Sequence, residues 1–206
     1  MTKPKHRIVS RNLICDNWIR LEELTIESGR LNDPGKLHSV NRFVHHHGSG
    51  ACVLPYDAGR DCVLLVRQLR APLVWLNLDD CWLIEAAAGL VDDGETPKEA
   101  IQREVVEELG YRCHSFVPLP MYYSSPGSVT EQVFPFLARY SQTDKHNDGG
   151  GLASEGEDIE VLEMSLVELS RLFRDGKIQD SKLQLCLLAL LAMLPGKREV
   201  PFASMF

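Results

Sequence analysis

The segment from residue 89 to residue 111 constrains the fold more than any other part of the chain, because its local signals all specify one helix. Thr96 is a good N-cap, Pro97 suits the first helical position, and Glu99 completes a Thr-x-x-Glu capping box. Gly110 stands where such a helix would end. Apolar residues recur every four positions and predict a buried stripe on one face: Ile101, Val105 and Leu109.

Three carboxylates lie on this predicted helix, at Glu104, Glu107 and Glu108. Positions i, i+3 and i+4 share one helix face, so the three side chains are expected to form an acidic ridge. Like charges at this spacing repel each other by about 0.2–0.5 kcal/mol per pair. A hard cation with oxygen ligands would reverse that effect, and Mg²⁺ is the usual cation beside phosphates. The alternative is a solvated helix face, since glutamate favours helices and is usually exposed.

A longer pattern surrounds these carboxylates and reads G-x5-E-x7-R-E-U-x-E-E-x-G-U, where U is a bulky apolar residue. It is filled by Gly89, Glu95, Arg103, Glu104, Val105, Glu107, Glu108 and Gly110. Seven fixed residues would match at a given start by chance with a probability on the order of 10⁻⁸. The pattern closely resembles the signature of the Nudix hydrolases and departs from it only at Tyr111, the last apolar position.

The resemblance implies an α/β fold from about residue 49 onward, an α/β/α sandwich built on a mixed sheet. A β-rich pattern from about Arg7 to His46 precedes it, and Gly48-Ser49-Gly50 marks a plausible boundary. We therefore expect a small N-terminal β-rich subdomain at residues 1–48 and a Nudix domain at residues 49–206.

The resemblance also assigns roles to the residues of the motif. Glu104 and Glu108 are the leading metal ligands, Glu107 assists, and the carbonyl of Ala88 adds a backbone ligand. Arg103 would orient a neighbouring glutamate through a bidentate pair. Divalent cations held in this way neutralise a diphosphate and activate an attacking water, so the expected cofactor is Mg²⁺, with Mn²⁺ able to substitute.

Similarity beyond the motif narrows the expected substrate. A segment that contains Pro126 and Glu131 resembles the S-P-G-x-x-T-E segment of nucleoside-diphosphate-sugar hydrolases, notably the ADP-ribose and GDP-mannose enzymes. The polar, glycine-containing loop 142–157 resembles the GDP-mannose subgroup, and Glu155 and Glu157 match its catalytic base and extra metal ligand. A solvated acidic loop is the alternative, and the catalytic base stays open among these two glutamates and Glu131.

Two arginines match substrate contacts in the same enzymes. Arg70 would contact the diphosphate or its sugar, a role that suits a guanidinium group. Arg42 would reach the substrate across a dimer, although its flanking residues depart from the usual ones. The nearby run from His45 to His47 does not predict a metal site, because consecutive strand residues point to alternate faces. We expect these histidines to be exposed near an interface.

Composition excludes several other functions. The 206 residues are 44% hydrophobic and 25% charged, which suits a globular domain with a small extension. A net charge of −7 argues against broad nucleic-acid or anionic-membrane binding, which needs a basic face. It does not argue against a phosphate ligand that binds together with a metal.

Cysteine spacing and hydropathy bear on location. The six cysteines include no C-x-x-C pair, which favours free thiols in a reducing compartment over a zinc site. The basic N-terminus lacks the apolar core of a secretory signal, and the apolar run 183–194 is too short to span a bilayer. The expected location is therefore the cytoplasm.

The sequence thus predicts a metal-dependent pyrophosphatase that splits a nucleoside diphosphate sugar into a nucleoside monophosphate and a sugar phosphate. The alternative is a non-catalytic Nudix-like module that binds a nucleotide sugar as a sensor, but a sensor does not need the complete acidic set. We also expect a homodimer, because segment 7–47 is too small to bury a core alone and similar hydrolases pair through it. The base and the sugar stay open, since substrate pockets lie in loops without a readable code.

Overall fold

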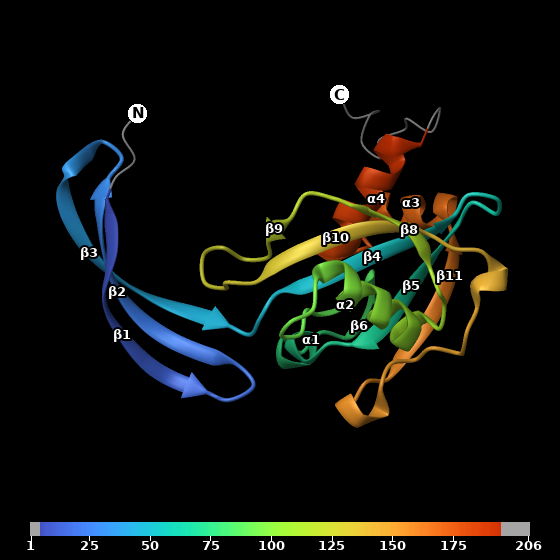
Figure 1. Ribbon diagram of the computed structural model, residues 1–206, viewed down its shortest axis with the longest axis horizontal. Coiled ribbons are helices and arrows are strands. Elements are labelled where there is room, and N and C mark those ends of the chain that lie inside the picture. Colours follow the sequence, from blue (N-terminus) through green and yellow to red (C-terminus); the bar gives the residue numbers. More distant parts are fainter. Residues whose placement is uncertain (1–4, 195–206) are drawn as a thin grey trace. The chain divides into compact units, whose positions relative to one another are not determined.

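The computed structural model describes residues 5–194, which form two compact units (Figure 1). Unit 1 consists of residues 5–49 and 122–133, and unit 2 consists of residues 50–121 and 134–194. The division expected at residue 48 places the segment 122–133 in the second domain, whereas its contacts place it in unit 1.

Unit 1 is built on an antiparallel sheet of three strands in the order β1-β2-β3. Its strands are β1 (His6–Asp16), β2 (Arg20–Arg30) and β3 (Asp33–His46). Strand β1 is irregular, since it carries one extra residue after Ile8 and another after Leu13 relative to β2. Every residue of β1 is exposed, and β2 contributes the only strongly buried positions among these strands, Glu22 and Leu24.

The segment 122–133 is fastened to the end of β3 by backbone hydrogen bonds. His45 N donates to Ser128 O (2.8 Å), and Thr130 N donates to His45 O (3.0 Å). Within the segment, β9 (Tyr122–Tyr123) pairs with the first two residues of β10 (Gln132–Arg139). These bonds explain why a segment far along the chain belongs with the N-terminal strands.

The second sheet has the main strand order β11-β5-β4-β10-β8, with β6 beside β5, β7 beside β4 and β9 beside β10. Its remaining strands are β4 (Gly50–Asp57), β5 (Cys62–Leu69), β6 (Trp82–Glu85), β7 (Ala87–Leu90), β8 (His114–Pro118) and β11 (Ile159–Ser165). The α-helices are α1 (Ala71–Trp75), α2 (Pro97–Glu104), α3 (Leu166–Arg174) and α4 (Ser181–Met193). A π-helical turn, η1 (Val105–Leu109), follows α2, and two short 3-10 turns are η2 (Gln142–Asp144) and η3 (Ala153–Glu155).

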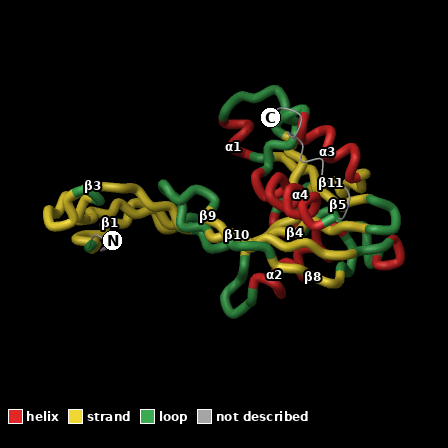
Figure 2. The backbone as a smooth tube through the Cα atoms, turned by 90° about the horizontal axis from the view of Figure 1, so that it is seen from above, coloured by secondary structure: helices red, strands yellow, loops and turns green. Residues whose placement is uncertain are grey.

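Strand β4 shows how unit 2 forms two apolar layers. Ala51 and Val53 belong to the core cluster that includes Ile101 of α2. The intervening Cys52 is buried and points to the other face, on which α4 packs against β4. Figures 1 and 2 show α2 and α4 on opposite sides of this sheet. The predicted α/β fold with an additional N-terminal β-sheet is therefore confirmed.

None of the helices in the described part of the chain is long and apolar enough to cross a membrane. All six cysteines, which fall within the described range, are free thiols.

Candidate active site

The acidic helix begins as the sequence predicts. Thr96 Oγ1 accepts a hydrogen bond from Glu99 N (3.3 Å), and Thr96 N donates to the Glu99 carboxylate (2.8 Å), which completes the capping box. The end of the helix differs from the prediction, because the α-helical repeat changes to the π turn η1 before Gly110 stops it with a φ of 76°. Turns of this kind are frequent at functional sites, and they change which side chains share a face.

The three glutamates do not form one exposed ridge. Glu104 and Glu108 are buried, with 9% and 1% of their surface exposed, while Glu107 is half-buried. Glu108 Oε2 accepts a hydrogen bond from Ala88 N in β7 (3.0 Å). The solvated-face alternative is therefore wrong for Glu104 and Glu108, because both carboxylates are packed toward the sheet.

The glycine that opens the motif leaves room for one of these carboxylates. A Cβ atom added at Gly89 would lie 1.8 Å from Glu104 Oε1. Any side chain at this position would displace the Glu104 carboxylate, which explains why the motif places a glycine beside a glutamate distant in sequence.

Arg103 joins the acidic residues into one network. Its guanidinium group donates to both carboxylate oxygens of Glu95, at 3.3 and 3.2 Å. The same group donates to Glu104 Oε1 (2.8 Å) and Glu107 Oε2 (3.1 Å). The expected bidentate pair is therefore present with Glu95, and Glu104 and Glu107 are each held by a single hydrogen bond.

Burial and mutual repulsion raise the pKa values of the buried carboxylates. Burial raises the pKa of Glu108 to about 8, the hydrogen bond from Ala88 opposes this, and the charges of Glu104 and Glu157 raise it further. Burial also raises the pKa of Glu104, which the Arg103 charge and hydrogen bond oppose. Glu157 therefore lies within electrostatic reach of both buried carboxylates.

The donor set fits a hard divalent cation in its chemistry. Glu104 Oε2 and Glu108 Oε1 accept no hydrogen bond from any residue between 5 and 194, so each keeps a free carboxylate oxygen. A cation would relieve the repulsion between these buried groups. Across the described residues, however, no group of three or more His, Cys, Asp or Glu side chains is arranged to hold an ion. The ligand assignments for Ala88, Glu104, Glu107 and Glu108 therefore stay predictions.

Backbone hydrogen bonds join the loop 142–157 to the end of the acidic helix. Gly150 N donates to Glu108 O (2.8 Å), and Gly151 N donates to Glu107 O (3.1 Å). The loop therefore has more fixed structure than its polar, glycine-rich composition indicates. These bonds provide partners for helix carbonyls that would otherwise have none.

The two loop glutamates occupy different environments. Glu157 is half-buried, and its Oε2 accepts a hydrogen bond from Leu152 N (2.8 Å). Glu155 is exposed in η3. Of the two residues, Glu157 is the one whose charge acts on the buried carboxylates.

Arg70 is held in a network that the sequence analysis missed. It donates to both oxygens of buried Glu85, at 2.5 and 2.7 Å, and Lys182 Nζ also donates to Glu85 (3.1 Å). Lys182 Nζ further contacts buried Asp180 (2.7 Å), which caps α4. One feature of the sequence could have indicated this network. Glu85 is the one acidic residue in the apolar run 82–88, and a buried charge needs partners. Arg70 stays 39% exposed.

The remaining candidates belong to unit 1. Arg42 is exposed on β3 and donates to the backbone carbonyl of Asn41 (2.8 Å). Pro126 is exposed, and Glu131 Oε1 lies 3.6 Å from His47 Nε2. The structure thus brings most of the charged candidates of unit 2 into one electrostatic cluster, with exposed Glu155 outside it, while these three residues lie in unit 1.

The expectation of three exposed histidines is wrong for two of them. His46 is exposed, but His45 and His47 are half-buried, with ring centroids 4.7 Å apart. The reason is that residues i and i+2 of a strand share a face, so these two rings pack together. Trp18 stacks on His47 at a centroid distance of 5.9 Å.

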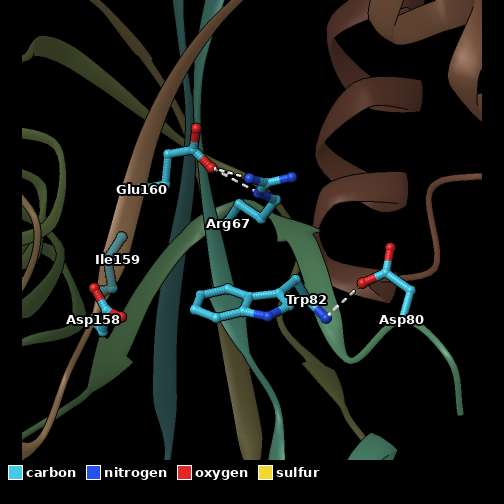
Figure 3. Close-up of a pocket in the computed structure, with 6 residues that line it drawn as sticks. All are labelled: Arg67, Asp80, Trp82, Asp158, Ile159 and Glu160. Atoms are coloured by element: carbon cyan, nitrogen blue, oxygen red, sulfur yellow. Dashed lines mark hydrogen bonds and ion pairs between the residues drawn. The ribbon is translucent and has the colours of Figure 1, made fainter.

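A cavity of about 310 Å³ opens elsewhere in unit 2, around Trp82 of β6 (Figure 3). Arg67 and Glu160 pair across β5 and β11 at 2.6 Å, and Asp80 and Asp158 lie at the sides. The neighbours of Arg67 and Glu160 along their strands belong to the core against α2, so these two side chains point to the other sheet face. The cavity is therefore separate from the acidic cluster.

Comparison with known proteins gives a consistent result. Residues 46–185 match the family model of the NUDIX domain. The chain is 38% identical over 175 residues to a GDP-mannose pyrophosphatase of Pectobacterium atrosepticum, a match that covers 85% of this chain and 88% of the relative. It is also 38% identical over 181 residues to a protein of that name from Cronobacter sakazakii, covering 87% of this chain and 92% of the relative. The protein of that name from Escherichia coli O1:K1 is 37% identical over 181 residues, with the same two coverages.

Proposed function

The chain belongs to the Nudix hydrolase family, and from that premise we propose that it hydrolyses the pyrophosphate bond of a nucleoside diphosphate sugar of the GDP-mannose or ADP-ribose type. The products are a nucleoside monophosphate and a sugar phosphate. The similarity to proteins named GDP-mannose pyrophosphatase supports this substrate class over most of the chain. The non-catalytic sensor has no such support.

The observation that carries the proposal is the buried carboxylate cluster. Glu104 and Glu108 each keep a carboxylate oxygen without a hydrogen bond from a described residue, in surroundings that disfavour their charge. These two residues would hold Mg²⁺ or Mn²⁺, with Glu107 and the Ala88 carbonyl as further ligands. When bound, such an ion neutralises the diphosphate and lowers the pKa of an attacking water.

The surrounding residues of the chain orient this cluster and move the proton. Arg103 holds Glu104 and Glu107 in place, and Glu95 in turn fixes the guanidinium group of Arg103. Glu157 is our leading candidate for the general base, supported by its electrostatic coupling to the buried carboxylates. Arg70 is held by Glu85 with 39% of its side-chain surface exposed, and its guanidinium group would contact a phosphate oxygen. Glu155 and Glu131 are the other candidates for the base.

We further propose that the enzyme is a homodimer in which Arg42 of one copy contacts the substrate of the other, with Pro126 and Glu131 as further substrate contacts. The exposed apolar residues of the β1-β2-β3 sheet support pairing, since a sheet of this size needs another surface to cover a face. A reducing compartment such as the cytoplasm fits six free thiols, two of them buried.

The test is turnover of GDP-mannose and ADP-ribose with millimolar Mg²⁺, with Mn²⁺ and with excess chelator, with products separated by ion-exchange chromatography. GDP-mannose should yield GMP and mannose 1-phosphate in the presence of metal and nothing with chelator. Full turnover in chelator, or release of GDP and free mannose, would contradict the proposal. Repeating the reaction in ¹⁸O-labelled water shows which phosphorus is attacked, because only one product gains the label.

A further inference from the structure

Unit 1 contains a cavity of about 370 Å³ that the proposed reaction does not use. It is formed within the β1-β2-β3 sheet and the segment fastened to it. Its polar lining consists of Arg11, Arg20, Glu22, His46 and Thr130. Arg11 and Arg20 are the only residues of this lining with a permanent positive charge, and their side chains are 61% and 49% exposed.

An extra residue in β1 places Arg11 on this face of the sheet. Arg7 faces Glu27 across β2, whereas Arg11, four residues later, faces Leu24. In a regular strand, residues four apart share a face. The extra residue, Val9, shifts the register, so Arg7 and Arg11 point to opposite faces.

Glu22 holds the two cavity arginines side by side. Its Oε2 accepts from Arg11 (3.1 Å), and its Oε1 accepts two hydrogen bonds from Arg20, at 2.9 and 2.7 Å. Glu22 is 8% exposed, so the carboxylate that orients the arginines is itself nearly buried. Each guanidinium group has five N–H donors and uses only some of them on Glu22. Of the others, Arg20 Nη1 lies 3.9 Å from Asp16 Oδ2, which is an ion pair but too long for a hydrogen bond. The donors not used on Glu22 can therefore bind a ligand in the cavity.

The charges on the two faces of the sheet differ. The cavity face carries three arginines, because Arg42 faces Leu24 from β3 in the same row as Arg11. Two carboxylates share this face, Glu22 and Asp16, and Asp16 lies 3.9 Å from Arg20. The opposite face carries Glu23 and Glu27, with Arg7 paired to Glu27. Positive charge is therefore in excess on the cavity face, although the whole chain has a charge of −7.

We propose that this cavity is a phosphate-binding site, in which Arg11 and Arg20 hold the oxygens of a mono- or diphosphate group. The two guanidinium groups are held on one carboxylate, and guanidinium donors form strong charge-assisted hydrogen bonds with phosphate oxygens. His46 adds a further polar group, since its Nδ1 is 2.6 Å from Thr130 Oγ1 and the ring is exposed. The site consists of residues of unit 1 and does not depend on the hydrolytic reaction.

The test uses the full chain and inorganic pyrophosphate in excess chelator, so that no metal can attract the anion to the acidic cluster. Isothermal titration calorimetry should give saturable binding with one site per chain. The double variant Arg11→Gln/Arg20→Gln should weaken this binding at least tenfold. Arg7→Gln is the matched control, because it removes the same charge from the same strand on the opposite face, and it should bind as the wild type does.

Three results would overturn the proposal: no saturable binding, unchanged binding in the double variant, or equal weakening in Arg7→Gln. Circular dichroism and melting temperature verify that each variant is folded. The variant Arg11→Lys/Arg20→Lys gives a second measurement, since it keeps the charge but loses the planar fork, and it should recover only part of the affinity.

A second arm identifies the source of the phosphate. If the site takes the diphosphate of the substrate, the double variant raises KM for the nucleotide sugar and Arg7→Gln does not. If it takes a separate phosphate compound, KM stays the same while pyrophosphate binding is lost. Calorimetry in chelator reports the site even if the proposed hydrolysis is absent, so the two proposals can fail independently.

Discussion

The two units bury their strands in opposite ways. All eight residues of β4 in unit 2 are buried, whereas all eleven residues of β1 in unit 1 are exposed. Exposed apolar side chains on β1 include Ile8, Leu13 and Ile14. Unit 2 therefore has the core that a stable domain needs, while the sheet of unit 1 has too little to be stable by itself. The comparison indicates that the sheet of unit 1 is stabilised by a further surface, and a second copy of the chain is the partner that we propose.

Charged groups differ within unit 1 as well as between the units. The Arg7–Glu27 pair of unit 1 is exposed, and such pairs contribute little to stability. Glu85 of unit 2 is 2% exposed and is held by two cations, and Glu22 of unit 1 is likewise nearly buried between two arginines. Loss of one partner at a buried carboxylate would leave buried charge without compensation. Substitution of Glu85 should therefore affect folding more than substitution of Glu27.

The largest expected effect comes from deleting residues 1–47, which should abolish both pairing and turnover. The reason is that the deletion removes the exposed strands that we expect to be covered by the second copy. Light scattering should give about twice the chain mass of 23.2 kDa for the full protein.

A single substitution tests the same prediction if the deletion variant does not fold. Leu13→Glu places a charge on an exposed apolar position of β1 and should also prevent pairing. The matched control in unit 2 is Val167→Glu, which changes an exposed apolar residue of α3. A monomer with full activity would show that unit 1 needs no partner, and Arg42 would lose its proposed role.

The next effect in size concerns the stability of unit 2. Glu85→Gln removes the partner of two cations and should cost about 3 kcal/mol near neutral pH. Burial by itself would raise the pKa of Glu85, but the Arg70 hydrogen bond and the Lys182 charge outweigh it and hold the pKa below its ordinary value. A lowered folded-state pKa stabilises the fold above the unfolded pKa, and this stabilisation is lost as pH falls through the folded pKa.

The measurement is urea unfolding of wild type and Glu85→Gln at neutral pH and at about pH 3. The difference between the two proteins should shrink at the lower pH. A difference that is constant across this range would show that the Glu85 charge contributes nothing.

The substitution Glu108→Gln tests whether the buried carboxylate serves catalysis or stability. Turnover should fall on the order of 10²-fold or more, as expected if the residue holds metal. The melting temperature should stay the same or rise slightly, because the change relieves repulsion from Glu104 and Glu157. The control is Glu168→Gln, which changes an exposed glutamate of α3. A variant that melts early yet turns over normally would reverse the assignment.

The smallest effect distinguishes the two glutamates of the loop. Glu157→Gln should lower turnover by about tenfold to a hundredfold with little change in substrate binding, as for a general base. Glu155→Gln should have less effect, because Glu155 is exposed and does not act on the buried carboxylates. Steady-state kinetics of both variants provide the comparison. Wild-type rates for both variants would move the search for the base to Glu131.

Local signals predicted local structure correctly. The Thr96–Glu99 capping box spans four residues and needs no partner from elsewhere in the chain. The start of α4 is also set by a local signal. Asp180 is the N-cap, since its carboxylate accepts from the backbone of Lys182 and Leu183.

Long-range contacts explain what the sequence did not predict. The π turn η1 lies where the carbonyls of Glu107 and Glu108 meet amides about forty residues later. The sequence does not show how Glu85 is paired, because its partners, Arg70 and Lys182, lie far from it in sequence. The motif itself could be recognised, but the burial that separates Glu104 and Glu108 from Glu107 depends on the packing of the whole unit.

The hydrogen bonds between the 142–157 loop and the acidic helix couple the opening of the loop to the opening of the helix end. The amide hydrogens of Gly150 and Gly151 are bound to the carbonyls of Glu108 and Glu107. They can exchange with solvent deuterium only when these bonds break. The two glycine amides should therefore exchange at the same rate as each other and more slowly than those of the exposed turn η3. Loop opening and fraying of the helix end would then be a single event, with one free energy that governs how often the buried carboxylates meet solvent.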